Sequence, residues 1–523
     1  MDDRPLHIAF LAAEALPYAK AGGLGDVAGA LPRAIAQAGH RVTLLLPLHG
    51  VVDREAHGLS PAGEGSLPFP DASTPLRYRR WEHAPAPGLR AILIDIPRYF
   101  QRDALYVDRA TGEGYADDGE RFLAFTLAAL DSLAEGPVPV DVIHCNDFHT
   151  GLAPALLERN WRDDPLLGRA ATLFSIHNLA YQGVFPLPLL ARAGISPAEA
   201  RYGSPYEFWG KLNCMKAGIV AADLVATVSP RYAEEIAGSA EFGHGLEGVL
   251  ADRLDTLVGV LNGIDTDEWS PATDPELAET YTAATVEAGK AANRRALREE
   301  AGLPDLDVPV LGVVSRLVRQ KGFDLLVPLL DHLLALPLQL VVLGSGEPAI
   351  EAAFNDAARY CPDKLRVWVK YDNRLAHRIE AGADLFLMPS RYEPCGLNQL
   401  YSLRYGTPPI VRATGGLADT VRDVTEAPED GTGFVFGEAR PEALFDAIRR
   451  ALALHGDPVA RLSLRRRIMG LDFSWSRSAA DYLRLYRAAI LRRAGDRRGA
   501  AALLAAIRAS QATISLPAAG QGP

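Results

Sequence analysis

The sequence predicts an α/β protein built from two doubly wound, Rossmann-like domains. A chain of 523 residues is too long for one ordinary hydrophobic core, so two domains are expected. Short apolar runs rich in β-branched residues alternate with helical stretches, which is the pattern of a parallel sheet covered on both faces. This alternation starts afresh near residues 250–265, which indicates a second sheet.

The first half of the chain contains a regular series of strands and helices. LHIAFLAAEA (6–15) is expected to be a buried strand leading into a glycine loop, and DVAGALPRAIAQAGH has helical spacing that ends at Gly39. Further strands are expected at 41–47, 90–96, 140–146, 171–178 and 223–229. Together they predict an N-terminal domain of residues 1–255.

The second half starts its own series with DTLVGVLNGID (255–265). Its further strands are expected at 308–316, 338–347, 364–372, 384–391 and 407–416. We therefore expect a C-terminal domain of residues 256–475. Residues 476–495 are predicted to form a helix, and residues 496–523 form an Ala-rich tail that we expect to be disordered in part.

Composition and charge exclude several classes of protein. The net charge of −11 argues against nucleic-acid binding, and no uncharged apolar run reaches the ~18–20 residues of a membrane span. The acidic start, MDDRPLHIAF, lacks the basic residues of a secretory signal. We expect a cytoplasmic protein without cofactor or metal, because its scattered cysteines lack metal-ligand spacing: Cys145, Cys214, Cys361 and Cys395.

Two similar glycine loops occupy positions after strands, where parallel sheets bind their ligands. They read KAGGLGDVAG (20–29) and ATGGLADTV (413–421). A glycine pair lets backbone N–H groups approach a phosphate, and the following helix adds its positive end. Neither loop matches the dinucleotide or ATP fingerprint. Matching positions in two facing domains would let the loops grip one ligand across a cleft, whereas the alternative is two ordinary tight turns.

SRLVRQKG (315–322) is the strongest electrostatic signal of the sequence. Arg316 follows a buried strand, and Lys321 precedes a glycine and an apolar helix. Two cations at the positive end of a helix are costly without an anion. A diphosphate would supply that anion, because guanidinium binds two oxygens as a fork and ammonium acts as a point charge. The alternative is a pair of solvated surface cations, and we expect Arg319 to face solvent.

RYEPCGLNQLY (391–401) follows another expected strand. Pro394 suits a first helical turn, which would place Glu393 at a helix start beside Gly396, stabilised by backbone amides. Glu393 is then either a plain cap or an acceptor of sugar hydroxyl groups near a developing cation. We expect Cys395 to be structural.

Polar side chains also follow strands of the first half. Asp147 lies in HCNDFHTG and His177 lies in SIHNLAYQG. A lone histidine is more often a packed group than a catalyst. A carboxylate after a buried strand, by contrast, seldom serves packing. NGIDTDEW contains Asp265 and Asp267, but two carboxylates are a weak metal signal. We interpret Asn262 as the start of a turn and reject a metal there.

These motifs, taken in order over roughly residues 6–475, resemble the bacterial glycogen synthases and plant starch synthases of glycosyltransferase family 5. The resemblance implies a GT-B fold, with the active site in the cleft and the helix 476–495 crossing back to the first domain. It implies transfer of glucose from ADP-glucose to the non-reducing end of an α-1,4-glucan, with retention and without a metal.

The same resemblance implies roles for individual residues. Arg316 and Lys321 would bind the diphosphate, Glu393 would be the essential acid, and Asp147 and His177 would serve the glucose or the acceptor. The further substrate-binding residues would be Lys20, Gly22, Gly23, Asn262, Cys395, Gly396, Leu397, Thr414, Gly415 and Gly416.

The chain departs from the family pattern in three places, one of which is the tail after residue 495, which has no counterpart in the family. Three other functions compete with the one that the resemblance implies. Ala21 replaces the usual Thr or Ser, and a donor-stacking ring within PRYFQRDALY is either Tyr99 or Phe100. One rival is the same fold with UDP-glucose as donor or a small sugar phosphate as acceptor. Another is a catalytically silent glucan-binding protein. A third, an NAD-dependent dehydrogenase, lacks its glycine fingerprint.

Overall fold

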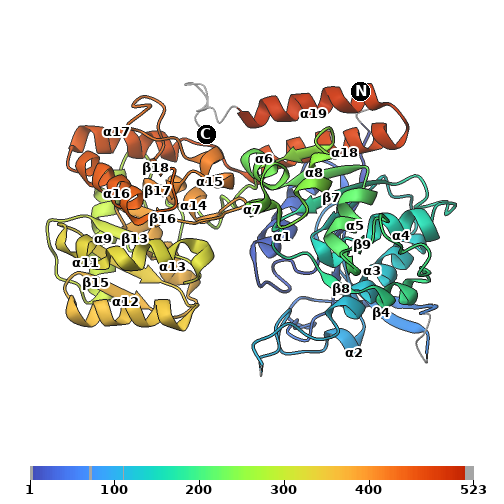
Figure 1. Ribbon diagram of the computed structural model, residues 1–523. Helices are drawn as coiled ribbons and strands as arrows, with labels where there is room; N and C mark the ends of the chain where they lie inside the picture. Colours follow the sequence, from blue (N-terminus) through green and yellow to red (C-terminus); the bar gives the residue numbers. More distant parts are fainter. Residues whose placement is uncertain (1–3, 70–73, 110, 513–523) are drawn as a thin grey trace. The chain divides into compact units, whose positions relative to one another are not determined.

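The computed structural model describes residues 4–69, 74–109 and 111–512, which form two compact units (Figure 1). The first unit contains the chain up to Gly263 together with Trp475–Gln511, and the second contains Ile264–Ser474. Each unit has its own parallel sheet with helices packed on it. The predicted α/β architecture of two doubly wound domains is confirmed.

The first sheet has the strand order β12-β11-β7-β6-β1-β2-β5-β4-β3. Its strands are β1 (His7–Leu11), β2 (Arg41–Pro47), β3 (Ser60–Leu67), β4 (Leu76–Ala86), β5 (Leu89–Asp95), β6 (Val142–Asn146), β7 (Ala171–Ile176), β11 (Leu224–Thr227) and β12 (Leu257–Gly259). All neighbours from β12 to β5 are parallel, and β4 and β3 extend that edge as antiparallel strands. Because β2 lies on one side of β1 and β6 on the other, the strand order reverses between β1 and β6.

Helices and a small antiparallel sheet, β8-β10-β9, complete the first unit. The small sheet is formed by β8 (Val184–Pro186), β9 (Glu207–Phe208) and β10 (Lys211–Asn213). The helices are α1 (Gly23–Gln37), α2 (Pro97–Phe100), α3 (Asp118–Ala134), α4 (Ala153–Asn160), α5 (Cys214–Ala221), α6 (Pro230–Gly238), α7 (Ala240–Gly243), α8 (Glu247–Ala251), α18 (Trp475–Arg493) and α19 (Arg497–Ala512). The red helix α18 packs on α1 and β7, and Tyr486 on it hydrogen-bonds His144 of β6 at 3.0 Å (Figure 1).

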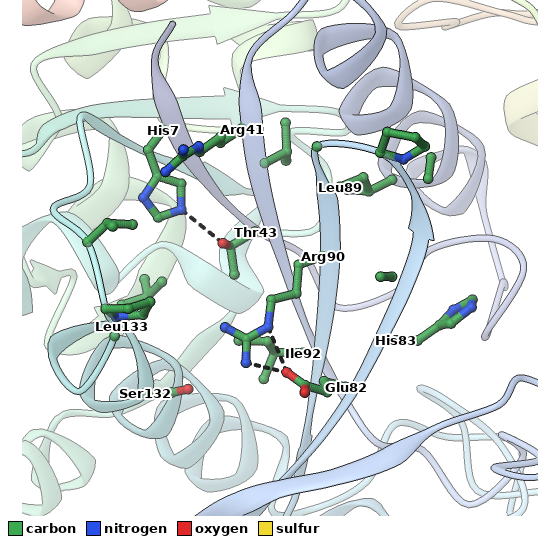
Figure 2. Close-up of a pocket in the computed structure, with 18 of the residues that line it drawn as sticks. His7, Arg41, Thr43, Glu82, His83, Leu89, Arg90, Ile92, Ser132 and Leu133 are labelled. Atoms are coloured by element: carbon green, nitrogen blue, oxygen red, sulfur yellow. Dashed lines mark hydrogen bonds and ion pairs between the residues drawn. The ribbon is translucent and has the colours of Figure 1, made fainter.

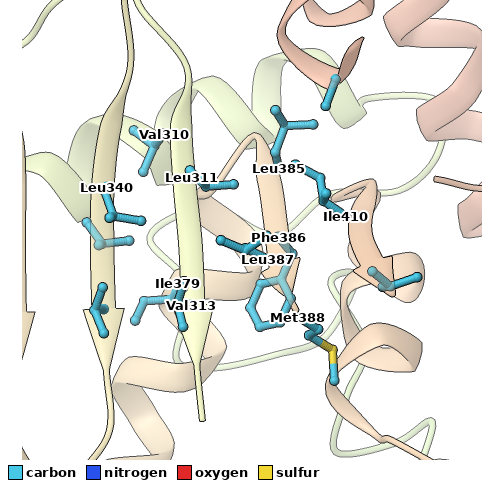
Figure 3. Close-up of a cluster of buried hydrophobic side chains, with 14 of the residues drawn as sticks. Val310, Leu311, Val313, Leu340, Ile379, Leu385, Phe386, Leu387, Met388 and Ile410 are labelled. Carbon is cyan, nitrogen blue, oxygen red and sulfur yellow. The ribbon is translucent and has the colours of Figure 1, made fainter. Parts of the chain in front are cut away.

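The second sheet is parallel throughout and has the order β15-β14-β13-β16-β17-β18. Its elements are α9 (Val286–Ala301), β13 (Val310–Val314), α10 (Phe323–Leu326), α11 (Leu330–Ala335), β14 (Gln339–Leu343), α12 (Pro348–Tyr360), β15 (Leu365–Trp368), α13 (Asn373–Gly382), β16 (Leu385–Met388), α14 (Asn398–Arg404), β17 (Pro409–Arg412), α15 (Gly415–Thr420), β18 (Phe434–Phe436), α16 (Pro441–His455) and α17 (Pro458–Met469). Apolar side chains of the central strands interlock in its core, among them Val313, Leu340 and Phe386 (Figure 3). The strand order reverses here between β13 and β16.

Some boundaries differ from those predicted. The strand assigned to the start of the second series, β12, pairs with β11 in the first sheet, and the first unit runs to Gly263 instead of residue 255. An apolar run reveals a strand but not its neighbour, which explains the error. Strands β3 and β4 were not predicted, because their exposed faces lack an apolar run. Of the Ala-rich tail, Arg497–Ala512 form α19, whereas residues 513–523 lie outside the described residues.

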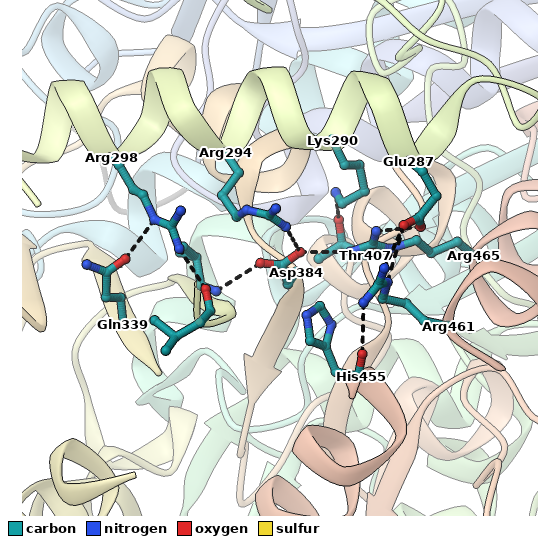
Figure 4. A network of polar contacts seen from close by, with 12 residues as sticks. Glu287, Lys290, Arg294, Arg298, Gln339, Asp384, Thr407, His455, Arg461 and Arg465 are labelled. Atoms are coloured by element: carbon teal, nitrogen blue, oxygen red, sulfur yellow. Dashed lines mark hydrogen bonds and ion pairs between the residues drawn. The ribbon is translucent and has the colours of Figure 1, made fainter. Parts of the chain in front are cut away.

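A buried polar network holds α9 to the second sheet (Figure 4). Lys290 is fully buried and its Nζ donates to Thr407 Oγ1 at 2.6 Å and to the carbonyl oxygen of Ala381 at 2.8 Å. The Asp384 carboxylate accepts from Arg294 at 2.7 Å and from Arg465 at 2.8 Å. These contacts satisfy charges that would otherwise be costly to bury.

Asp384 gives this network a defined pH dependence. Burial alone would raise its pKa, but the guanidinium groups of Arg465 and Arg294 outweigh burial and lower it. A carboxylate with a lowered folded-state pKa adds stability above its unfolded pKa of about 3.9, and this stability is lost as the pH falls through the folded-state value.

Replacing Asp384 by Asn is expected to lower the free energy of unfolding at pH 7 by about 3–5 kcal/mol, because Arg465 and Arg294 lose the buried anion that they share. Arg465 then keeps only Glu287 as an ion-pair partner among the described residues. Urea denaturation would measure this, and the difference from wild type should shrink below about pH 4. Glu276→Gln is the matched control: it removes an exposed ion pair with Arg374 (3.0 Å) and should change stability by less than about 0.5 kcal/mol. An unchanged midpoint for Asp384→Asn at pH 7 would contradict the argument.

Candidate active site

The polar residues singled out in the sequence gather at the points where strand order reverses. In doubly wound sheets, ligands bind at the carboxyl ends of the strands beside this reversal. In the first unit, Lys20 lies in the connection after β1, and Asp147 follows β6 directly. In the second unit, Lys321 lies in the connection after β13, and Glu393 follows β16. Each unit therefore carries its own group of candidate site residues.

Asp147 is held in a strained backbone conformation. Its φ of 53° and ψ of −177° lie in a region that is almost restricted to glycine, and strain of this kind concentrates at functional sites. Its carboxylate accepts the backbone N–H of His177 at 2.7 Å. Burial raises the pKa of Asp147 to about 7, against the effect of this hydrogen bond. The strained loop thus fixes a carboxyl group that can change its protonation near neutral pH.

His177 is a neutral hydrogen-bonding group. Burial lowers its pKa to about 4, so the ring is uncharged at neutral pH. Its Nε2 lies 2.8 Å from Oδ1 of Asn146, whose Nδ2 donates to the carbonyl oxygen of Leu11 at 2.9 Å. This network assigns the proton to Nε2 and leaves Nδ1 as an acceptor. His177 can therefore orient a hydroxyl group without carrying charge.

Glu14 is a candidate residue that the sequence analysis missed. One oxygen of its carboxylate accepts the backbone N–H groups of Ala21 and Gly22, the latter at 3.0 Å. Burial raises the pKa of Glu14 to about 7. Like Asp147, Glu14 is a carboxylate shortly after a buried strand, so the same signal could have found it. Its hydrogen bonds use two of the amides that we expected to face a phosphate.

The first glycine loop is nevertheless open at one position. Lys20 Nζ forms an ion pair with Asp26 at 2.6 Å, and a Cβ atom at Gly25 would lie only 2.9 Å from Cγ of Lys20. By contrast, a Cβ atom at Gly23 would meet nothing within 4 Å. Gly25 is therefore needed for packing, whereas Gly23 borders unfilled space at the start of α1, where a ligand can approach.

Lys321 and Glu393 form the centre of the group of candidate site residues in the second unit. Lys321 Nζ lies 2.5 Å from Oε2 of Glu393, and Ser390 Oγ donates to the same oxygen at 3.0 Å. The prediction that Glu393 starts a helix is wrong, because α14 begins only at Asn398. Glu393 is also the anion that the sequence argument overlooked: it already neutralises one of the two cations assigned to a diphosphate.

Arg316 is more accessible than Lys321. Its side chain is exposed, and its guanidinium lies 3.4 Å from Oε1 of Gln320, at the long end of the hydrogen-bond range. Arg319 is exposed as expected and lies 3.5 Å from Asp324. Arg316 can therefore turn toward an anionic ligand at small cost.

The second glycine loop differs from the first in its role. Gly415 has a φ of 43°, and a Cβ atom there would lie 1.9 Å from the carbonyl oxygen of Glu393. The N–H of Gly416 donates to that oxygen at 3.2 Å. The loop follows β17, whereas the first loop follows β1, so the two do not occupy matching positions as we expected. Its glycines allow close packing on the segment that carries Glu393.

Most of the remaining predicted site residues lie close to Glu393 or in the second glycine loop, whereas Asn262 lies apart from them in the chain. Cys395 and Thr414 are buried, and Gly396 has a φ of 75°; Leu397 immediately precedes α14. Asn262 follows β12 at the end of the first unit, and its Oδ1 is buried without a hydrogen-bond partner in the part of the chain that the structure describes.

Neither aromatic residue proposed for donor stacking has an accessible ring. Tyr99 is buried and its hydroxyl bonds Glu120, and Phe100 is fully buried. Tyr106, from the same segment, packs its ring against His149 with centroids 5.0 Å apart. Burial and the charges of Glu14 and Asp147 raise its pKa. Tyr106 is therefore the ring of this segment that reaches the site.

Two cavities of the first unit lie in different places. One of about 500 Å³ adjoins the site, with Phe148, Tyr181 and His244 in its wall. The other, of about 640 Å³, lies at the amino ends of the strands (Figure 2). There His7 Nε2 bonds Thr43 Oγ1 at 2.9 Å and Arg90 pairs with Glu82, so these four side chains are already paired with one another, whereas Ser132 Oγ in the same wall has no hydrogen-bond partner among the described residues. The candidate active site therefore lies at the carboxyl ends of the strands, where the first of these cavities is found.

Comparison with known proteins identifies the family. A family model described as starch synthase catalytic domain matches residues 7–252, and one described as glycosyl transferases group 1 matches residues 294–467. A glycogen synthase from an Anaeromyxobacter species is 47% identical over 92% of this chain and 99% of its own. One from Koribacter versatilis is 45% identical over 92% of this chain and 98% of its own.

The chain belongs to the glycogen and starch synthase family. As a member, it is a glycosyltransferase. The catalytic domain of starch synthase IV from Arabidopsis thaliana, solved with ADP and acarbose, is 33% identical, with a TM-score of 0.84 over 93% of this chain and 100% of that chain. A sucrose-phosphate synthase from Thermosynechococcus elongatus, 20% identical with a TM-score of 0.57 over 92% of this chain and 98% of that chain, shares the fold.

Like other members of this family, the chain transfers sugar from a sugar nucleotide to a glucan.

Within the described ranges, 4–69, 74–109 and 111–512, no helix is long and apolar enough to cross a bilayer.

Gly23→Ala tests whether the open loop borders the ligand. Nothing contacts the added methyl group, and alanine favours a helix over glycine, so thermal stability should be kept or slightly raised. We expect kcat/KM for glucosyl transfer to fall about tenfold or more, equivalent to ~1.4 kcal/mol, because the methyl group occupies ligand space. Gly248→Ala in α8 also meets nothing within 4 Å, so it should likewise keep or slightly raise thermal stability, but it should leave kcat/KM unchanged. Wild-type activity of Gly23→Ala would disprove ligand contact there.

Proposed function

We propose that this chain lengthens α-1,4-glucan by transferring glucose from ADP-glucose to non-reducing ends, with retention of configuration. The observation that carries this proposal is the placement of Arg316 and Lys321 in one loop at the strand reversal, with Glu393 against Lys321. The choice of donor is supported by the starch synthase IV structure, which was solved with ADP and acarbose bound.

The cations of the second unit suit the leaving group. When the bond between glucose C1 and the phosphate oxygen breaks, negative charge grows on the diphosphate. Arg316 can bind two of its oxygens and Lys321 can act as a point charge, and such preorganised groups usually contribute most to catalysis. Since Lys321 is paired with Glu393 at 2.5 Å, an arriving diphosphate competes for the same ammonium group. Glu393 is then released to accept a hydrogen bond from a glucose hydroxyl.

The carboxyl group of Asp147 and the neutral ring of His177, both in the first unit, suit the sugar. Asp147 and neutral His177 offer one proton-exchanging group and one acceptor to sugar hydroxyls. A new bond forms between C1 and the acceptor's O4 as the bond to phosphate breaks. The hydroxyl proton passes to the departing phosphate oxygen on the same face of the sugar. Configuration is retained, and no covalent sugar–enzyme bond forms.

Three related functions remain as alternatives, and the residues favour them less. A UDP-glucose donor would use the same cations and would differ only at the base. A small sugar-phosphate acceptor would need a second anion site, whereas the cavity beside Asp147 is lined by aromatic and uncharged polar groups as well as Asp118. A silent glucan-binding protein would have no use for a paired Lys321 and Glu393.

Donor competition tests the proposed function. With glycogen as acceptor, kcat/KM for ADP-glucose should exceed that for UDP-glucose by at least about tenfold, or ~1.4 kcal/mol. Radiolabelled glucose should appear in alcohol-precipitable glucan. Preference for UDP-glucose would overturn the donor assignment, and label confined to soluble disaccharide would overturn the acceptor.

Arg316→Ala and Lys321→Ala test the role of the cations. In each variant kcat/KM should fall by the equivalent of ~2–4 kcal/mol of transition-state stabilisation, because one preorganised donor to the diphosphate is lost. Arg319→Ala is the matched control, because Arg319 lies in the same loop, exposed, beside Asp324. If all three variants retained wild-type turnover, the diphosphate assignment would be wrong.

A further inference from the structure

The first unit displays a tryptophan almost entirely to solvent. The side chain of Trp209 is 85% exposed, and nearby Tyr202 is 89% exposed. Large aromatic side chains normally bury most of their surface, and exposed ones that gather on one region mark sites of interaction. Within the described residues, the one ring contact that Trp209 makes is the edge contact with its neighbour Phe208, and it leaves the indole almost fully exposed.

The backbone at Trp209 makes this residue more unusual. Trp209 and Gly210 connect β9 to β10, with Phe208 opposite Lys211 in the register. Their φ values are 51° and 77°, the combination of a two-residue type I′ hairpin turn. Asn, Asp or Gly is preferred at the first position of this turn, whereas a bulky residue there is strained. The chain thus keeps an exposed indole ring at a cost to its own stability.

Hydrogen bonds make this turn rigid. The N–H of Gly210 donates to Oε1 of Glu207 at 2.7 Å. Lys216 Nζ donates to the carbonyl oxygen of Glu207 at 2.5 Å and to that of Ser204 at 3.1 Å, which ties the loop after Tyr202 to the turn. A ring on a rigid support loses little entropy when it binds a ligand.

The turn is continuous with the cavity beside the active site. Trp209 contacts Phe208 with ring centroids 6.2 Å apart, and the Phe208 ring lies against Gly245. The preceding residue, His244, lines the cavity and accepts from Gln182 at 3.1 Å through its backbone oxygen. Phe148 also lines the cavity, and it directly follows Asp147 in the chain. A surface therefore runs from the strained carboxylate, through the cavity, to Trp209.

We propose that Trp209, with Tyr202 on the loop that Lys216 ties to the turn, is a platform that binds the acceptor glucan at a distance from its reacting end. The proposal rests on the proposed function, since it takes the acceptor to be a long α-1,4-glucan. Each glucose unit has apolar C–H faces that stack on an aromatic ring. The glucan carries no charge, which suits a surface where aromatic groups predominate. A polymer that reaches from the site to the turn gains affinity by binding at both places.

Trp209→Asn removes the ring and places a preferred residue in the turn, so its melting temperature should equal or exceed that of wild type. We expect its KM for glycogen to rise about three- to tenfold, the range of one lost ring contact, with kcat and the KM for maltotriose unchanged. Its retardation in native gels containing glycogen should weaken. Trp209→Phe should retain most of the binding, and Tyr360→Asn, which removes an 86% exposed ring from α12, should behave as wild type.

Three results would overturn the platform. One is a Trp209→Asn variant with wild-type KM for glycogen and wild-type gel mobility. Another is an equal rise of KM for maltotriose, which would place Trp209 at the reacting end. The third is a change of molecular mass by light scattering, which would assign the ring to self-association. If wild type bound glycogen in the gel but transferred no glucose to either acceptor, the proposed function would fail while the gel still tested the platform.

Discussion

The reversal of strand order in each parallel sheet is the constraint on which the candidate site depends. Connections from β1 and β6 leave their sheet in opposite directions, and those from β13 and β16 do the same. The carboxyl ends of these strands therefore border an uncovered edge. Asp147 can keep its strained backbone there because the rigid sheet holds it, and Lys321 reaches Glu393 across neighbouring strands. Without the reversal, the crossing helices would cover these groups.

The two units differ in the kind of charged side chain that each places at the carboxyl ends of its own strands. The first presents carboxyl groups, Glu14 and Asp147, whose pKa values burial raises to about 7, together with a neutral histidine. The second presents Arg316 and Lys321, and only Lys321 is neutralised by a carboxylate. Carboxyl and neutral imidazole groups suit sugar hydroxyls, because they can donate or accept hydrogen bonds, whereas cations suit a diphosphate. This division supports an acceptor bound mainly by the first unit and a donor bound mainly by the second.

Most strands and most polar site residues could be predicted from the sequence, because their signals are local. A buried strand followed by Asp147, or by Arg316, is visible in a few residues. Features that depend on distant partners could not be predicted. The sheet to which β12 belongs, the ion pair between Lys321 and Glu393, and the packing of Gly415 on the Glu393 backbone each join segments far apart in the chain. Trp209 was missed because the two features that mark it, its positive φ and its exposed side chain, are visible only in the structure.

The central claim is that a nucleotide diphosphate takes over the charge that Lys321 now shares with Glu393. A crystal structure of the complex with ADP would test it most directly. We expect diphosphate oxygens within ~3 Å of both the Arg316 guanidinium and Lys321 Nζ, with the Lys321–Glu393 contact lengthened. ADP bound elsewhere, with that contact still at 2.5 Å and Arg316 turned away, would contradict the account.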